Sequence, residues 1–279
     1  MLHVVRRSPE QFGHPHSRWT LHTLRQSLDW LRTLTLSGVC RLLKRLKISL
    51  KRGRLYLHSP DPAYETKRST LELKRLRVQY QPQQEVFLYL DEFTYYRQPT
   101  LAYDYEVAGH VYPLARLSYG SNPYQRLIGA LNALTGQVTY RHQAKIGVEA
   151  IADFMDDLRQ TYPEATTLYV ALDNNPLHFH PTVLARVQPQ TFAWQQVLPP
   201  TWSAEVTPGS LPIVFLPLPT YASWLNPIEK LWHWLNRTVL HLHRYADDWD
   251  ALQARVIAFL NQFSTASDAL LRYVGLLPY

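Results

Sequence analysis

Residues 86–92 read Val-Phe-Leu-Tyr-Leu-Asp-Glu, a continuous apolar run that ends in two carboxylates. Such a run is too short for a helix and predicts a strand that is buried on both faces of a sheet. Residues 168–173, Leu-Tyr-Val-Ala-Leu-Asp, repeat the pattern and also end in an aspartate. Two buried strands that each lead into an acidic residue indicate an α/β fold with a site at one edge of its sheet.

The segments around these strands complete the predicted α/β domain. Three further strands are expected, at 127–132, 138–142 and 213–216. Apolar residues at helical spacing predict a helix that ends at Pro163, and Asn226-Pro227 has the form of a helix start.

Three carboxylates are expected to meet at the edge of this sheet. Ligands of open α/β sheets bind where the strands end, so Asp91 and Asp173 are expected to share a site, and Glu229 lies in the first turn of the helix after the last strand. Carboxylates that converge repel one another unless a cation neutralises them, and oxygen ligands select Mg²⁺ or Mn²⁺. Two such ions, about 3.5–4 Å apart, can catalyse phosphoryl transfer.

Each carboxylate also has a purely structural interpretation of about equal weight. An aspartate after a strand often forms a turn, as Asp173-Asn174-Asn175-Pro176 could, and Glu229 follows Asn226 at the spacing of a helix cap. Weaker candidates for metal ligands are Glu92, Asp104 and Glu106.

A histidine and two tryptophans accompany the acidic residues. His178 follows Asp173 closely and would lie near any site there, whereas the remaining histidines fit chance in a chain with 12 of them. Trp224 and Trp232 flank Glu229. Core packing is the expected role of both, although Trp224 could also stack on a base.

Charge is unevenly distributed along the chain. Residues 1–80 contain 17 lysines and arginines against 5 acidic residues, whereas residues 81–279 contain 12 against 17. A basic part that precedes an acidic body favours a polyanion-binding module over a surface kept basic for solubility. The single cysteine excludes a disulfide framework and paired-cysteine zinc sites. No signal peptide or apolar membrane span is evident, so a cytoplasmic protein is expected.

The basic part has the pattern of a helix-turn-helix. The first helix is predicted to bury Leu21, Leu24, Leu28 and Leu31. Ser37 is predicted to cap a second helix that buries Val39, Leu42, Leu43 and Leu46. Its exposed basic face fits a recognition helix better than a solvated helix of a small bundle. The candidate DNA-binding residues are Ser37, Arg41, Lys44, Arg45, Lys47, Lys51 and Arg52.

Three motifs follow one another in the acidic body. They are Leu-Tyr-Leu-Asp-Glu at 88–92, Leu-Asp-Asn-x-x-x-His at 172–178, and Leu-Pro-x-Pro-x-Tyr-x-x-x-Leu-Asn-Pro-Ile-Glu-x-x-Trp at 216–232. With the helix-turn-helix, this set resembles the DDE-type transposases of bacterial insertion sequences in the Tc/mariner superfamily, over about residues 18–245. The Asn-Pro-Ile-Glu element is the most specific part.

The resemblance implies an RNase H-like mixed sheet flanked by helices, preceded by a small all-α helix-turn-helix region. It implies a metal-binding catalytic triad of Asp91, Asp173 and Glu229 that holds Mg²⁺ or Mn²⁺, as two ions. The implied supporting residues are Asn174, His178 and Asn226.

Members of the family cleave double-stranded DNA at inverted-repeat ends and join the 3′-OH to target DNA, as homodimers or larger assemblies. The implied protein is associated with the nucleoid and not with a membrane. Two alternatives stay open: a non-catalytic DNA-binding remnant, and a structure-selective nuclease of the same fold.

The expected domains are a helix-turn-helix region at 1–58, a linker and helix at 59–84, the catalytic domain at 85–260 and a tail at 261–279. Two features depart from the family. Only one helix-turn-helix fits before the linker, which leaves open a missing or separately encoded upstream unit. Asp173 and Glu229 are 56 positions apart, more than is usual, which leaves open whether Glu229 reaches the two aspartates.

Overall fold

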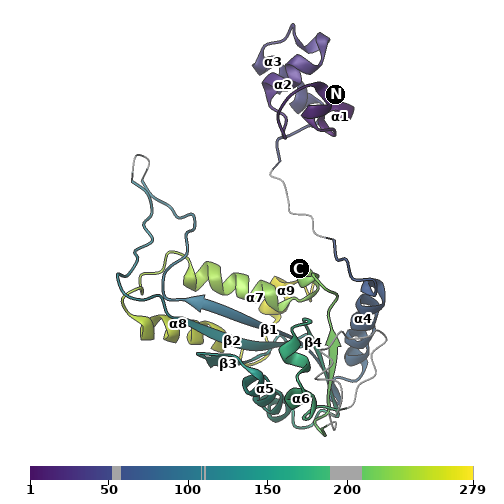
Figure 1. Cartoon of the computed structure of the whole chain (residues 1–279), viewed down its shortest axis with the longest axis vertical. Coiled ribbons are helices and arrows are strands. Elements are labelled where there is room, and N and C mark those ends of the chain that lie inside the picture. Colours follow the sequence, from purple (N-terminus) through teal and green to yellow (C-terminus); the bar gives the residue numbers. More distant parts are fainter. Residues whose placement is uncertain (52–57, 108, 110, 189–208, 279) are drawn as a thin grey trace. The chain divides into compact units, whose positions relative to one another are not determined.

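The chain divides into two compact units, Met1–Tyr56 and Leu57–Tyr279 (Figure 1). The computed structural model describes residues 1–51, 58–107, 109, 111–188 and 209–278. No helix in these stretches is long and apolar enough to cross a bilayer.

The N-terminal unit is all-helical. Its elements are α1 (Leu2–Val5), the 3₁₀ turn η1 (Pro9–Phe12), α2 (Leu21–Ser27), the 3₁₀ turn η2 (Asp29–Leu31) and α3 (Leu36–Arg45). Leu24, Leu31 and Val39 form its buried core, as the helix-turn-helix pattern predicts. The N-terminus of α2 has a capping box between Thr20 and Thr23.

Three details of the predicted helix-turn-helix were wrong. Leu28 has extended backbone angles, so α2 ends at Ser27 and Leu31 reaches the core from η2. The hydroxyl of Thr35, not that of Ser37, caps α3 by accepting a hydrogen bond from the Gly38 amide at 3.1 Å. Leu46 follows the end of α3 and is 43% exposed instead of buried.

The C-terminal unit is built on a five-stranded sheet in the order β3-β2-β1-β4-β5. The strands are β1 (Glu85–Tyr96), β2 (Tyr124–Asn132), β3 (Val138–Gln143), β4 (Thr167–Leu172) and β5 (Ile213–Pro217). β1, β2 and β3 pair antiparallel, whereas β1, β4 and β5 pair parallel. The mixed sheet confirms the α/β prediction, but β1 does not end at Asp91, because its ladder with β2 continues to Tyr96.

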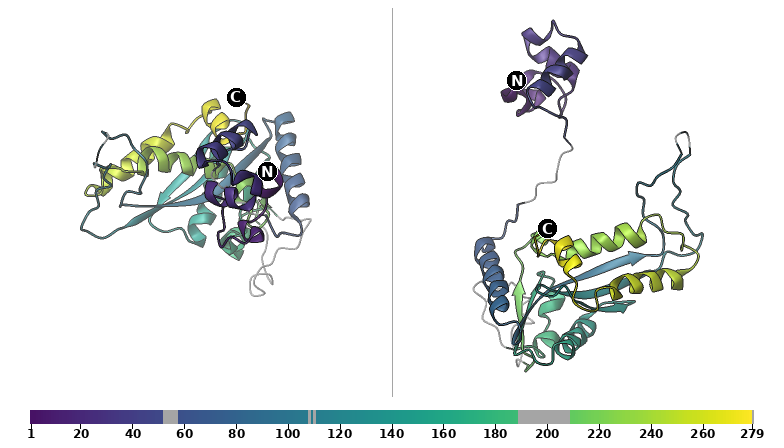
Figure 2. Two further views of the ribbon diagram at one scale, coloured as in Figure 1. Left: turned by 90° about the horizontal axis from the view of Figure 1, so that it is seen from above. Right: turned by 180° about the vertical axis from the view of Figure 1, so that it is seen from behind.

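Helices cover both faces of the sheet (Figures 1 and 2). One face packs against α5 (Val148–Thr161) and α6 (Pro181–Leu184). The other packs against α4 (Tyr64–Tyr80), α7 (Ile228–Leu235), α8 (Trp249–Asn261) and α9 (Asp268–Val274). Shorter turns are η3 (Pro176–Phe179), η5 (Ser223–Leu225) and the π-helical η6 (Asn236–Leu240). Alternate β1 residues enter the two cores, since Phe87 and Tyr89 lie in one and Leu88 and Leu90 in the other.

Residues expected as a linker and a tail are integral to this unit. The hydroxyl of Ser59, which is 3% exposed, donates a 2.6 Å hydrogen bond to the carbonyl of Thr220. Leu71 of α4 and Leu270 of α9 are buried in the same core as β1. The amide of Ser267, before α9, donates to the carbonyl of Thr135 in the β2–β3 turn.

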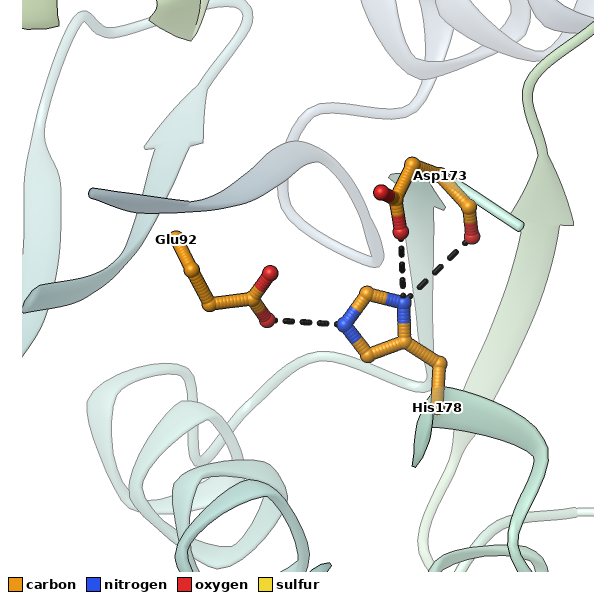
Figure 3. Close-up of side chains that lie close together, drawn as sticks. All are labelled: Glu92, Asp173 and His178. Carbon is orange, nitrogen blue, oxygen red and sulfur yellow. Dashed lines mark hydrogen bonds and ion pairs between the residues drawn. The ribbon is translucent and has the colours of Figure 1, made fainter. Parts of the chain in front are cut away.

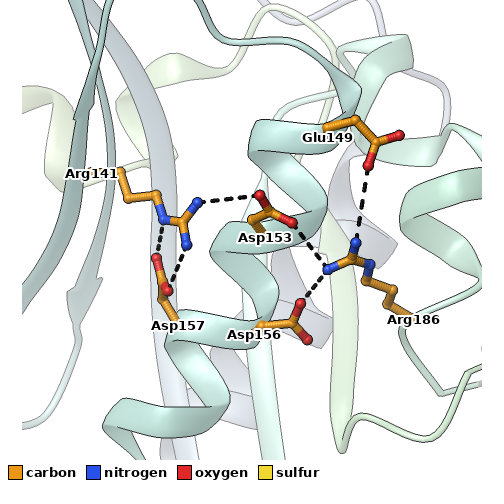
Figure 4. Close-up of polar contacts among 6 residues, drawn as sticks. All are labelled: Arg141, Glu149, Asp153, Asp156, Asp157 and Arg186. Carbon is orange, nitrogen blue, oxygen red and sulfur yellow. Dashed lines mark hydrogen bonds and ion pairs between the residues drawn. The ribbon is translucent and has the colours of Figure 1, made fainter.

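Two arginines fix the acidic surface of α5 (Figure 4). Arg141 of β3 pairs with Asp157 and, at 3.5 Å, with Asp153. Arg186, which follows α6, pairs with Asp156 and, at 3.2 Å, with Asp153. Partly exposed pairs contribute little individually, so this network mainly fixes how β3, α5 and α6 are joined.

A substitution at Gly136 would test how α9 is attached to the β2–β3 turn. Its φ of +74° favours glycine, and a Cβ there would lie 2.4 Å from the carbonyl oxygen of Ser267. Gly136→Ala is therefore expected to lower the free energy of unfolding by about 2 kcal/mol or more, measured by thermal denaturation. The control is Gly147→Ala, where no atom lies within 4 Å of the new methyl group; an equal loss in both variants would contradict this account.

Candidate active site

The strand register brings Asp91 and Asp173 to the same edge of the sheet. Leu88 and Tyr89 of β1 pair with Val170 and Ala171 of β4, and β4 ends at Leu172. Asp91 therefore lies where its parallel neighbour ends, although β1 itself continues. The expected proximity was correct, and the reason is the end of β4 and not the end of β1.

Asp91 is oriented by α7. The indole Nε1 of Trp232 donates a 3.0 Å hydrogen bond to the carboxylate of Asp91, and the indole stacks on Phe93 with ring centroids 5.5 Å apart. Trp232 approaches β2 at Gly129, the residue paired with Asp91, where a Cβ would lie 2.8 Å from the indole. Glycine at this position is what allows Trp232 to reach Asp91.

Glu229 reaches the same place from the first turn of α7. The side-chain amide of Asn226 donates a 3.0 Å hydrogen bond to the carbonyl of Leu90, which fastens the start of α7 to β1. The Glu229 amide donates to the backbone carbonyl of Asn226 at 3.2 Å, but the Asn226 side chain makes no capping bond to α7, so the interpretation of Asn226 and Glu229 as a side-chain helix cap was wrong. Asp91 and Glu229 line one pocket of about 180 Å³, despite the long sequence interval before Glu229. The pocket-lining residues are Asp91, Glu92, Phe93, Glu229, Trp232, His233 and Asn236.

Burial and mutual repulsion both disfavour the charged carboxylates of this pocket. Burial, followed by the charges of Glu229, Glu92 and Asp173, raises the pKa of Asp91 to about 8. Burial, together with Asp173, also raises the pKa of Glu229. The structure thus couples the three expected triad carboxylates electrically, and their uncompensated charge is what a divalent cation would neutralise. An all-oxygen set of this kind fits Mg²⁺ or Mn²⁺.

Asp173 has a different environment, which its neighbour His178 creates (Figure 3). The buried imidazole of His178 lies between two carboxylates, with Nδ1 3.1 Å from Asp173 Oδ1 and Nε2 2.7 Å from Glu92 Oε1. These carboxylates outweigh the effect of burial and raise the pKa of His178 to about 10. Burial by itself would raise the pKa of Asp173. The hydrogen bond with His178 outweighs it and holds the pKa of that carboxyl below its usual value.

Glu92 was underrated by the sequence reasoning. Among the described residues, Glu92, Asp173 and His178 form the one group whose potential ligand atoms all lie within 4.8 Å. Neither the strand pattern nor the spacing signals that Glu92 reaches His178, because the contact joins β1 to the turn after β4. Asp173 also accepts a hydrogen bond from the Asn175 amide at 3.0 Å, so the predicted turn and the site coexist.

The remaining candidate residues differ in where the structure places them. Asn174 donates a 2.7 Å hydrogen bond from its side chain to the carbonyl of Leu218 and so joins the ends of β4 and β5. Asp104 and Glu106 are exposed in the β1–β2 connection and accept bonds from the next backbone amides instead of joining the site. Trp232 is buried as expected, whereas Trp224 is 48% exposed, so core packing was wrong for Trp224.

The candidate DNA-binding residues lie on the surface of the N-terminal unit. Those that the structure describes are all exposed: Ser37, Arg41, Lys44, Arg45, Lys47 and Lys51. Ser37, Arg41 and Lys44 follow helical spacing on the side of α3 away from buried Val39. Arg52 lies outside the described residues.

Comparisons with known proteins give matches over most of the chain. A family model described as DDE superfamily endonuclease matches residues 86–253. The insertion element IS630 uncharacterized 39 kDa protein of Shigella sonnei is 23% identical over 252 residues, which span 90% of this chain and 66% of that protein.

Solved structures of Mos1 transposase have the same fold. The paired-end complex with the left transposon end matches with a TM-score of 0.58 at 16% identity and covers 95% of this chain and 77% of that one. The Mos1 mariner paired-end complex with Mn matches with a TM-score of 0.56 at 18% identity and covers 95% and 78%. The predicted RNase H-like fold is thereby confirmed.

The pKa of Asp91 generates a stability prediction. The pKa of Asp91 is 3.8 in the unfolded chain and about 8 in the folded one. Its protonated form therefore stabilises the fold below pH 4, and this stabilisation is lost as the pH rises to 8. In EDTA, Asp91→Asn is therefore expected to raise the melting temperature at pH 8 by about 5 °C and to have little effect at pH 4. Mn²⁺ is expected to stabilise the original chain more than the variant. Equal melting curves at pH 8 without metal would refute the electrostatic account.

Proposed function

Because the chain belongs to the DDE superfamily of endonucleases, we propose that it is the transposase of an insertion sequence. In this proposal it cleaves DNA at the ends of its element and transfers the freed 3′-OH to target DNA. The observation that carries the proposal is the meeting of Asp91, Asp173 and Glu229 at one edge of the sheet, with Asp91 and Glu229 in a common pocket. The chain spans 66% of its IS630 relative, so the activity rests on the site and not on the relative's name.

Asp91, Asp173 and Glu229 would hold divalent metal, Mg²⁺ or Mn²⁺, as two ions. Metal bound there would activate the attacking water or 3′-OH and stabilise the charge that develops on the phosphoryl oxygens. The chain's own residues orient the carboxylates. Trp232 holds one oxygen of Asp91, and His178 holds one oxygen of Asp173.

Recognition of DNA is assigned to the N-terminal unit. The exposed face of α3 presents Ser37, Arg41 and Lys44, which would contact phosphates and base edges of double-stranded DNA. The acidic C-terminal unit contributes little net attraction, so α3 and its flanking basic residues would supply most of the affinity.

Homo-assembly is part of the proposal, because two element ends have to be held together. The β1–β2 connection supports it, since this segment exposes a series of large apolar side chains. They are Leu101, Tyr103, Tyr105, Val107, Val111, Tyr112, Leu114, Leu117 and Tyr119. Exposed apolar surface of this extent marks an interaction site, and we assign it to a second copy of the chain.

The complete carboxylate set favours a catalytic protein over a non-catalytic remnant. Supercoiled plasmid that carries the DNA flanking the gene, incubated with Mn²⁺ or Mg²⁺, tests this. Wild type is expected to cut at the element ends, and Asp173→Asn to reduce the rate at least about a hundredfold, because a metal ligand is lost.

The matched control for this assay is Glu164→Gln, which changes an exposed carboxylate between α5 and β4, outside the site, and is expected to cut normally. Unchanged cleavage by Asp173→Asn would refute the assignment. Preference for branched DNA over linear ends would instead identify a structure-selective nuclease.

A separate prediction concerns α3. Arg41→Ala combined with Lys44→Ala is expected to weaken binding to a duplex from the element end. The slope of log affinity against log salt concentration is expected to fall by the equivalent of about one to two phosphate contacts. Electrophoretic mobility shifts at several salt concentrations measure both. Arg272→Ala on α9 is the control, and an equal effect there would contradict a specific role for α3.

A further inference from the structure

Tyr221 has a strained backbone and an exposed ring. Its φ is +55°, and within the described part of the chain only Lys47 and Leu242 are other non-glycine residues with positive φ. Its side chain is 70% exposed. Such strain persists only where the surroundings impose it, and it gathers at functional sites.

The backbone around Tyr221 is held on both sides. Pro219 and Ala222 are buried, and the Ala222 amide donates a 3.2 Å hydrogen bond to the Pro219 carbonyl across the turn. Before the turn, the Leu218 amide donates to the carbonyl of Leu172 at 2.8 Å. The exposed ring therefore projects from a fixed loop and not from a loose one.

Thr220 is held by residues that precede α4. Its carbonyl accepts from the Ser59 hydroxyl, and its amide donates to Asp61 Oδ2 at 2.9 Å. The same carboxylate accepts from Lys67 at 2.8 Å in a pair that is almost fully buried. Burying two charges is costly unless every partner is in place, so this cluster fixes Thr220 firmly and imposes the backbone of Tyr221.

The loop connects the end of β5, which is bonded to the residues around Asp173, with α7, which carries Glu229. Leu218 is bonded to the residue before Asp173 and, through its carbonyl, to Asn174. Downstream, the chain passes through η5 into α7, which carries Glu229. Trp224 on the same loop is half-exposed, and its indole donates to the Tyr64 hydroxyl at 3.3 Å.

We propose that Tyr221 binds DNA by stacking its ring on a base of the strand that enters the carboxylate site. This inference rests on the proposed function and assigns to that site a nucleotide-binding residue. Stacking on an aromatic ring needs no positive charge and accepts any base, which suits a site on an acidic unit.

Tyr221→Gly separates the ring from the strain, since glycine adopts positive φ without cost. The probe is an element-end duplex with 2-aminopurine beside the cleavage position that wild type produces on plasmid. In metal-free buffer, wild type and Tyr221→Phe are expected to quench the probe. Tyr221→Gly is expected to lose the quenching and bind about tenfold more weakly, with an unchanged or higher melting temperature.

Tyr80→Ala is the control, because Tyr80 is exposed at the end of α4, before β1 begins, and is expected to quench normally. Quenching retained by Tyr221→Gly, or lost equally in Tyr80→Ala, would overturn the inference. A fall in oligomeric state with normal quenching would also overturn it and assign Tyr221 to a protein contact. If wild type itself neither cuts nor binds the element end, the proposed function fails instead.

Discussion

The charge of four carboxylates gathered at one edge of the sheet is the constraint that the rest of the site accommodates. Glu229, Glu92 and Asp173 add to the effect of burial in raising the pKa of Asp91, and Asp173 acts in the same direction on Glu229. Asp173 and Glu92 share the imidazole of His178, so their charge is largely compensated within the protein. Asp91 receives neutral donors, the Trp232 indole and the Glu92 backbone amide, and is left with a raised pKa. His178 already compensates the charges of Asp173 and Glu92. An added cation would therefore be stabilised most at Asp91, whose charge is not compensated.

The alternation of β1 allows these two environments to coexist. Successive side chains of a strand point to opposite faces, so Asp91 meets Trp232 of α7 while its neighbour Glu92 meets His178 of η3. Helices on both faces are consequently required for the site, and Gly129 is required for one of them to approach closely enough. This requirement links the layered architecture directly to the position of each carboxylate.

Sequence reasoning located the strands and the convergence of the carboxylates because buried strands and their acidic ends have local signals. It failed where a contact joins distant segments. Nothing near Ser59 or Asp61 reveals that they bind Thr220, so a docked segment was expected to be a linker. The role of Glu92 was hidden for the same reason. The cap of α3 was misplaced by two residues, because Thr35 and Ser37 have equivalent hydroxyls and only the backbone geometry distinguishes them.

The docked segment joins the start of the C-terminal unit to the loop that precedes α7. Ser59 and Asp61 lie just after the boundary between the two units, and both bond to Thr220, in the loop that leads into Glu229. The Thr220 amide bonds to the carboxylate of Asp61, which also forms the buried ion pair with Lys67, so the loop and the ion pair depend on the same aspartate. Tyr221 follows Thr220 directly, so the contacts that hold this segment also fix the strained backbone from which the exposed ring projects.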